Sequence, residues 1–135
     1  MGSVIMEGTS QWLNRLNEQV VSDKITIRLM ARDERIVDTP PFTGDGMKAE
    51  DVTLIEKGVL NCFLLNLYAA RKTGRPVTRN AGFGVVMEPG DRTLEEMIAS
   101  VDRGLIVGGF SGGQPGANGE FSGVAKNSFY VENEI

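Results

Sequence analysis

The sequence predicts an α+β fold made mainly of antiparallel β-hairpins, with two or three short helices between them. Segments that read as strands outnumber segments in which apolar residues have helical spacing. The strands come as hairpins joined by short turns, which favours antiparallel pairing over a parallel sheet with crossover helices. The length of 135 residues is that of one ordinary domain, so we expect residues 1–135 to form a single domain.

The first predicted element is a helix over residues 10–20. Trp12, Leu16 and Val20 recur every four residues, which places them on one face of a helix. Ser10 stands where an N-cap is expected. The spacing therefore predicts a capped amphipathic helix.

A strand follows, in which Ile25, Ile27 and Leu29 alternate with polar residues. A charged turn at residues 32–35 ends this strand. The prolines and glycines of residues 39–46 are typical of an irregular loop.

A β-hairpin is predicted over residues 52–65. Residues 52–55 form its outgoing strand, residues 56–58 its turn and residues 59–65 its returning strand.

A short helix, a loop and a strand come after the hairpin. Asn66 can cap the helix, which Gly74 ends and Pro76 seals. The glycine-punctuated residues 78–84 predict a loop, and the apolar residues 85–87 predict the strand after it.

Another helix begins after Thr93. Thr93 and Glu96 have the spacing of a capping box. Apolar residues follow at i, i+3, i+4 and i+7, namely Leu94, Met97, Ile98 and Val101. We expect Gly104 to stop this helix.

The last part of the chain predicts a long hairpin. Residues 105–107 begin one strand, residues 111–119 are rich in turn formers, and residues 120–131 return. The chain then stops at residues 132–135, which read as the turn out of a strand with no partner after it. We therefore expect the chain to be a fragment of a longer protein.

The composition excludes several classes of function. The chain has no histidine, so it lacks the commonest general base and the commonest zinc ligand. Its 14 basic and 18 acidic residues leave a net charge of −4, which disfavours direct binding of nucleic acid. No apolar run approaches the ~20 residues that cross a bilayer, and no signal peptide is visible, so we expect a cytoplasmic protein without membrane contact. One cysteine, Cys62, cannot form an internal disulfide, which agrees with a reducing compartment.

The glycine-rich residues 104–123 are the first candidate site. A phosphate-binding loop needs a helix after its glycines, and here a strand follows. The glycines fit turns and bulges of a hairpin better. A further hypothesis is that strand positions without side chains let another backbone approach, as when an extended peptide adds to the edge of a sheet.

Other candidate groups have structural explanations. Asp45, Glu50 and Asp51 lack the spacing of a calcium loop and fit a solvated turn. Cys62 has no neighbouring base that could form its thiolate, and it fits a small buried hydrophobe. The basic residues between positions 71 and 79 suit the C-terminal end of a helix.

A series of short motifs follows residue 40 in one order. The first half holds Pro41-Phe42, Asp45-Gly46, Leu54-Ile55-Glu56-Lys57-Gly58-Val59-Leu60, Tyr68-Ala69-Ala70-Arg71-Lys72-Thr73-Gly74 and Thr78-Arg79-Asn80-Ala81. The second half holds Glu95-Glu96-Met97-Ile98, Gly104-Leu105-Ile106-Val107, Gly112-Gly113, Asn118-Gly119-Glu120-Phe121-Ser122 and Val131-Glu132-Asn133. In this order and spacing they resemble the central-to-C-terminal part of the PmbA/TldD family, peptidase-related proteins once called modulators of DNA gyrase. The resemblance covers residues 41–135 and is loose over residues 1–40.

The resemblance implies a PmbA/TldD C-terminal-like fold and a family of metallopeptidases and partner subunits, commonly dimeric, that act in peptide maturation and proteolysis. In the active members it implies a zinc site, with a His-Glu-x-x-x-His motif upstream of the region seen here and a cysteine ligand downstream. This chain falls between the two, and its Cys62 does not correspond to that ligand. We therefore expect no catalytic residue, no metal ligand and no cofactor in this chain, zinc being left to the full-length member or its partner. Pro41-Phe42 and residues 70–74 are closer to the PmbA side, the subunit without the motif.

The leading hypothesis is a non-catalytic scaffold that holds a peptide and a partner subunit. Two alternatives stay open: the substrate-binding half of an active TldD-type zinc metallopeptidase, and a modulator that contacts gyrase. The expected partners are a PmbA/TldD-type subunit or a second copy of the chain, together with a peptide substrate. The expected peptide-binding residues are Asn80, Gly82, Gly112, Gly113, Phe121 and Ser122.

Overall fold

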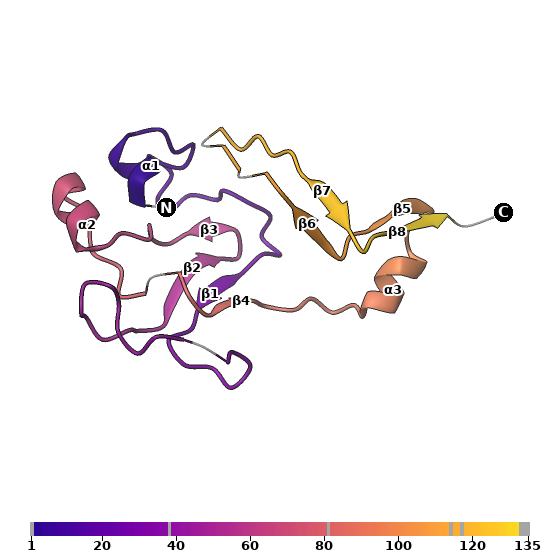
Figure 1. The fold of residues 1–135 in the computed structure, drawn as a ribbon, viewed down its shortest axis with the longest axis horizontal. Coiled ribbons are helices and arrows are strands. Elements are labelled where there is room, and N and C mark those ends of the chain that lie inside the picture. Colours follow the sequence, from indigo (N-terminus) through magenta and orange to yellow (C-terminus); the bar gives the residue numbers. More distant parts are fainter. Residues whose placement is uncertain (1, 38, 81, 114, 117, 133–135) are drawn as a thin grey trace. The chain divides into compact units, whose positions relative to one another are not determined.

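The computed structural model describes residues 2–37, 39–80, 82–113, 115–116 and 118–132. It divides into two compact units, Met1–Pro89 and Gly90–Ile135. Figure 1 follows the chain through both. Short helices accompany antiparallel strands in each unit, which confirms the predicted α+β class.

The first unit is built on a sheet whose described strands have the order β3-β2-β1-β4 (Figure 1). These strands are β1 (Ile27–Leu29), β2 (Val52–Glu56), β3 (Val59–Leu60) and β4 (Val85–Met87). Every pairing between them is antiparallel. The strands predicted at residues 25–29 and 85–87 are therefore confirmed as β1 and β4, and they lie side by side.

The predicted hairpin is present, and residues 57–58 form its turn. Lys57 and Gly58 have φ of 46° and 82°, as a tight two-residue hairpin turn requires. The returning strand ends at Leu60, five residues earlier than the predicted end at Leu65. The chain leaves the sheet there because Phe63 and Leu65 turn into the core, where they are 9% and 2% exposed.

The helix predicted over residues 10–20 is wrong. The segment forms turns and lies along the outer side of β3, where Asn17 donates to the carbonyl of Leu60 at 2.7 Å and Val20 to that of Gly58 at 2.8 Å. Trp12 and Leu16 still pack on the core, so the apolar pattern reports burial without reporting a helix. The N-terminal helix is instead α1 (Gly2–Met6).

The helix after the hairpin, α2 (Leu67–Thr73), forms where its caps predict it. The Asn66 side chain accepts from the N–H of Ala69 at 2.9 Å, and Gly74 closes the helix with φ of 66°.

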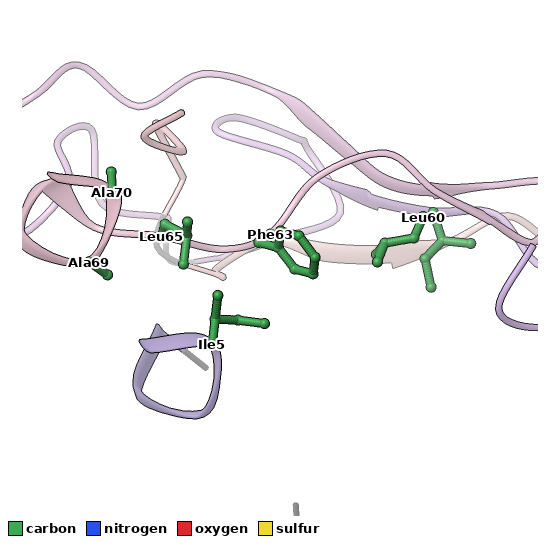
Figure 2. Close-up of a cluster of buried hydrophobic side chains, with 7 residues drawn as sticks. Ile5, Leu60, Phe63, Leu65, Ala69 and Ala70 are labelled. Carbon is green, nitrogen blue, oxygen red and sulfur yellow. The ribbon is translucent and has the colours of Figure 1, made fainter. Parts of the chain in front are cut away.

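The core of the first unit lies where α1, α2 and the inner face of the sheet meet. Figure 2 shows Ile5 of α1 beneath Phe63 and Leu65, with Ala69 of α2 beside them. The small side chains of Ala69 and Ala70 let α2 pack closely against α1. The buried members are Ile5, Ile55, Leu60, Phe63, Leu65, Ala69 and Ala70.

In its described residues, the second unit has one helix and a long hairpin. The helix is α3 (Leu94–Ala99), and the hairpin pairs β5 (Arg103–Ile106) with β8 (Phe129–Glu132) and β6 (Gly109–Ser111) with β7 (Val124–Lys126). The predicted hairpin is thus confirmed, with a break at residues 107–108. A Cβ at Gly108 would lie 2.5 Å from the carbonyl oxygen of Asn127, so glycine is needed at this close approach of the two backbones. Most of the predicted exit turn at the chain end, residues 133–135, lies outside the described residues.

The capping box of α3 is confirmed, whereas its predicted end is wrong. Thr93 N–H donates to Glu96 Oε2 at 2.8 Å, and Glu96 N–H donates to Thr93 Oγ1 at 3.2 Å. The helix ends at Ala99, before Gly104, which lies within β5. A Cβ at Gly104 would come within 2.8 Å of the Val101 side chain, so this glycine serves close packing rather than helix termination.

Candidate functional site

Asn80, the first residue predicted to bind peptide, is buried and organises the loop that leads into β4. It is 4% exposed. Its Oδ1 accepts from the N–H groups of Gly82 and Phe83 at 3.0 and 3.2 Å, and its Nδ2 donates to the carbonyl of Glu50 at 3.2 Å. Gly82 has φ of 86°, a conformation that glycine adopts without strain. Asn80 and Gly82 therefore hold the loop in one conformation together, and this conformation sets where β4 begins.

The other predicted peptide-binding residues belong to the second unit. Gly112 and Gly113 have φ of 73° and 70°, and a Cβ on Gly113 would collide with the carbonyl oxygen of Ser122. Phe121 packs edge to face on Phe110 with their ring centroids 5.3 Å apart. The structure thus brings these four residues together at the far part of the hairpin, and the backbone that approaches Gly113 is the chain's own, whereas a Cβ on Gly112 would meet no heavy atom within 4 Å.

A cavity of about 500 Å³ opens beside Asn80, between α1, the start of α2 and the turn at residues 43–45. Most of the polar side chains that line it already have partners. Asp45 accepts from the N–H of Leu67 at 2.8 Å, and Thr78 donates to the carbonyl of Phe63. The cavity offers space but few uncommitted groups, so it does not dictate a ligand by itself.

Cys62 borders a second cavity, of about 270 Å³, which does not activate it. Burial raises the pKa of the Cys62 thiol, and its Sγ lies 3.8 Å from the carbonyl of Thr53. The nearby cations are engaged, since Arg79 pairs with Glu50 at 2.8 Å and Arg75 lies over the Phe63 ring at 4.6 Å. The thiol is therefore a poor nucleophile.

Zinc does not fit the residues at hand. Within the described ranges, no group of three or more His, Cys, Asp or Glu side chains is arranged to hold a metal ion. The single thiol has its pKa raised, which works against the thiolate that zinc prefers. No step of a zinc-dependent reaction can be assigned to these side chains.

The structure shows one candidate site that the sequence did not predict, the outer edge of β4. Met30 N–H donates to the carbonyl of Gly84 at 2.9 Å, and Glu88 N–H donates to the carbonyl of Thr26 at 3.1 Å. In an antiparallel ladder, main-chain groups alternate between the two sides of a strand. Residues 84, 86 and 88 therefore face β1, and the N–H and C=O groups of Val85 and Met87 point to the other side. In the part of the chain that the structure describes, no strand pairs with that side.

The two edges of this sheet differ. At β3, residues 17–20 accept and donate main-chain hydrogen bonds and cover the edge. At β4, Val85 and Met87 are 62% and 61% exposed. The apolar run at residues 85–87 was visible in the sequence, but its edge position was not, because its neighbour β1 lies far back in the chain.

The comparisons with known proteins agree with this architecture. Residues 1–134 match the model of the family described as PmbA/TldA metallopeptidase C-terminal domain. The chain is 31% identical over 137 residues to metalloprotease PmbA of Escherichia coli O157:H7, covering 98% of this chain and 30% of that protein. It is 28% identical over 104 residues to a zinc metalloprotease TldD homolog of Saccharolobus solfataricus, covering 68% of this chain and 24% of that protein.

Two crystal structures are similar over almost the whole chain. A protein of Bacteroides thetaiotaomicron that carries the name modulator of DNA gyrase superimposes with a TM-score of 0.83 at 34% identity, over 98% of this chain and 30% of that one. TldE of Thermococcus kodakarensis superimposes with a TM-score of 0.81 at 26% identity, over 97% and 33%. The chain thus spans about a third of the length of these structures. Among the described residues, no helix is long and apolar enough to cross a membrane. From the family match over residues 1–134 and these relatives, the chain belongs to the PmbA/TldD metalloprotease family, in the region of its C-terminal domain.

Proposed function

We propose that this chain is a non-catalytic, peptide-holding part of a PmbA/TldD-type metalloprotease, and that an extended peptide adds to it along the outer edge of β4. The observation that carries the proposal is the outward direction of the Val85 and Met87 main-chain groups, which follows from the Met30–Gly84 and Glu88–Thr26 hydrogen bonds. Unpaired strand groups are a template for another extended backbone.

The proposal assigns holding rather than cleavage to this chain because the sequence lacks histidine and, among the described residues, no group of side chains is arranged to hold a metal ion that would activate water. The Cys62 thiol also has a raised pKa. Cleavage then belongs to parts of the protein outside these residues or to a partner subunit. We propose a PmbA/TldD-type subunit, or a second copy of this chain, as that partner.

The residues predicted from the sequence enter the proposal in two ways. Asn80 and Gly82 position the loop that leads into β4, so they act on the edge without touching the peptide. Gly112, Gly113, Phe121 and Ser122 form a second proposed contact area on the hairpin of the other unit. Phe121 is 47% exposed, so its ring is accessible to a bound chain.

The experiment that tests the edge uses two changes at one position. Proline at Met87 removes an N–H that points away from β1 and leaves the hydrogen bonds of Gly84 and Glu88 to β1 in place. Alanine at Met87 shortens the same side chain and keeps the N–H. Binding of a fluorescent extended peptide to the 135-residue chain, followed by anisotropy, should weaken about five- to tenfold more for Met87→Pro than for Met87→Ala.

A second peptide separates edge pairing from other modes of binding. N-methylation of alternate peptide nitrogens removes the donors on one edge only, so one of the two methylation frames should lose binding and the other should keep it. If the two N-methylated peptides bound equally, and Met87→Pro and Met87→Ala had equal effects, pairing of the peptide with the β4 edge would be contradicted.

The enzyme alternative rests on the relative named zinc metalloprotease TldD homolog. On this alternative, the longer protein that contains this chain cleaves peptides itself. A peptidase assay of that longer protein decides the matter, since chelator-sensitive turnover without any partner would favour it.

The name modulator of DNA gyrase, carried by a similar structure, supports a third candidate, direct contact with gyrase. Co-purification with gyrase that survives moderate salt would favour it, because screened surface charges would then not explain the contact.

A further inference from the structure

We infer that the β4 edge selects extended segments with apolar side chains at positions i and i+2, placed opposite Met87 and Val85, and a polar side chain between them. This inference rests on the proposed function and names the class of peptide that the edge would take.

The inner face of the sheet is organised in two cross-strand rows that run out to this edge. One row follows the register Leu60–Ile55–Ile27–Met87, and the other follows Val52–Leu29–Val85. Residues directly opposite one another in antiparallel strands share a face of the sheet. Met87 and Val85 are therefore the last members of the two apolar rows.

Burial falls steeply at the end of each row. Leu60 and Ile55 are each 2% exposed and Leu29 is 1% exposed, whereas Met87 and Val85 are 61% and 62% exposed. An antiparallel fifth strand would place two of its side chains, separated by one residue, directly beside Met87 and Val85. Apolar side chains there continue both rows and remove the exposed apolar surface from water.

On the opposite face of the sheet, β4 contributes one apolar residue, the partly buried Val86, and polar and charged side chains surround it. Arg28, which pairs with Val86 in the register, donates to Glu88 at 2.7 Å and to Thr53 at 3.1 Å. The middle residue of an added strand would lie beside Val86 on this face, next to the Arg28–Glu88 ion pair. Because Val86 is already partly buried, an apolar side chain there removes less exposed surface from water than one beside Met87 or Val85, and a polar side chain stays hydrated.

The size of the preference follows from cross-strand pairing. Each favourable cross-strand pair tightens binding about threefold relative to an alanine pair, so two such pairs give about tenfold tighter binding. Proline is disfavoured at the two positions opposite Met87 and Val85, because the N–H groups there face β4.

The test compares two peptides of identical composition with the 135-residue chain. In the alternating peptide, two valines flank one serine, and in the blocked peptide, the two valines are adjacent. Anisotropy titrations should give about tenfold tighter binding of the alternating peptide. The double variant Val85→Thr, Met87→Thr places β-branched residues that suit a strand at both positions, and it should reduce that ratio toward one while still binding both peptides.

The outcomes separate this inference from the proposed function. Binding that depends on the N-methylation frame but shows equal affinity for the alternating and blocked peptides would overturn the inference and leave the edge as a peptide site. A preference for the alternating peptide that persists in the double variant would also overturn it, since the selectivity would then arise elsewhere. If neither peptide binds, or N-methylation has no effect in either frame, the proposed function itself fails. Circular dichroism of the double variant checks that it is folded.

Discussion

The N–H of Met30 donates to the carbonyl oxygen of Gly84 at 2.9 Å, and the Cα of Gly84 faces the carbonyl oxygen of Met30 so closely that a Cβ would collide with it. Gly84 has φ of 64°. This contact sets the register of β4 on β1 and thereby decides which main-chain groups reach the outer edge.

Gly84→Ala should destabilise the protein by about 2 kcal/mol or more. The new Cβ meets main-chain atoms of Met30, and alanine is also strained at positive φ. Urea denaturation measures the loss. The matched control is Gly44→Ala, where no heavy atom lies within 4 Å of the added Cβ, and it should stay within about 0.5 kcal/mol of the parent. Equal stability of the two variants would contradict the role given to Gly84.

Asn80→Ala should cost about 2–3 kcal/mol, because the change leaves the carbonyl of Glu50 and the N–H groups of Gly82 and Phe83 without their buried partner. It should also speed amide exchange in residues 82–88, because the Asn80 side chain holds the N–H groups of the first two of these residues, and it should weaken peptide binding at β4. The control is Asn61→Ala, at a partly buried asparagine that lines the cavity near Cys62. Hydrogen exchange with mass spectrometry reads the loop directly. Unchanged exchange in residues 82–88 would show that Asn80 does not position β4.

The ion pair of Asp33 with Arg35 should appear in an NMR titration. Hydrogen bonds from Arg35, led by those of its side chain, lower the pKa of Asp33 from 3.8 to about 2. Because the folded-state pKa is lowered, the stabilisation from this group is fully present above pH 3.8 and is lost as the pH falls through about 2. Arg35→Gln removes the guanidinium but keeps the N–H of residue 35, which donates to Asp33 Oδ1 at 2.9 Å, so the midpoint of the Asp33 titration should rise from about 2 part of the way toward 3.8. The same midpoint in both proteins would contradict the assignment.

Cys62 should react slowly with a thiol reagent such as DTNB near neutral pH in the folded chain. Burial raises its pKa and lowers the fraction of thiolate. In urea, where the thiol is solvated, the same residue should react at the rate of a free cysteine. Addition of zinc should leave the slow folded-state rate unchanged. A fast reaction of the folded protein would show that the thiol is activated.

Local signals explain the parts of the fold that could be predicted. The hairpin turn at Lys57-Gly58, the caps Asn66 and Gly74, and the Thr93–Glu96 box all act within a few residues. Each satisfies main-chain groups or permits a backbone angle without help from distant parts of the chain. Their structures therefore follow from the adjacent sequence.

The candidate site was predictable only in part. The sequence predicts Asn80 and Gly82 as site residues. In the structure, Asn80 is buried and holds the loop that precedes β4. The sequence does not predict the β4 edge, because residues 85–87 by themselves do not show which side of the strand pairs with β1.

The amino-acid sequence alone determined the family, the α+β class, the turns and caps, and the absence of histidine chemistry, because these depend on residue type and near neighbours. Only the tertiary structure decided that residues 10–20 cover β3 as turns and that β4 keeps an outward edge. Both depend on hydrogen bonds between segments far apart in the chain. Such long-range pairing overrides local preference because it satisfies main-chain groups and buries apolar side chains at the same time.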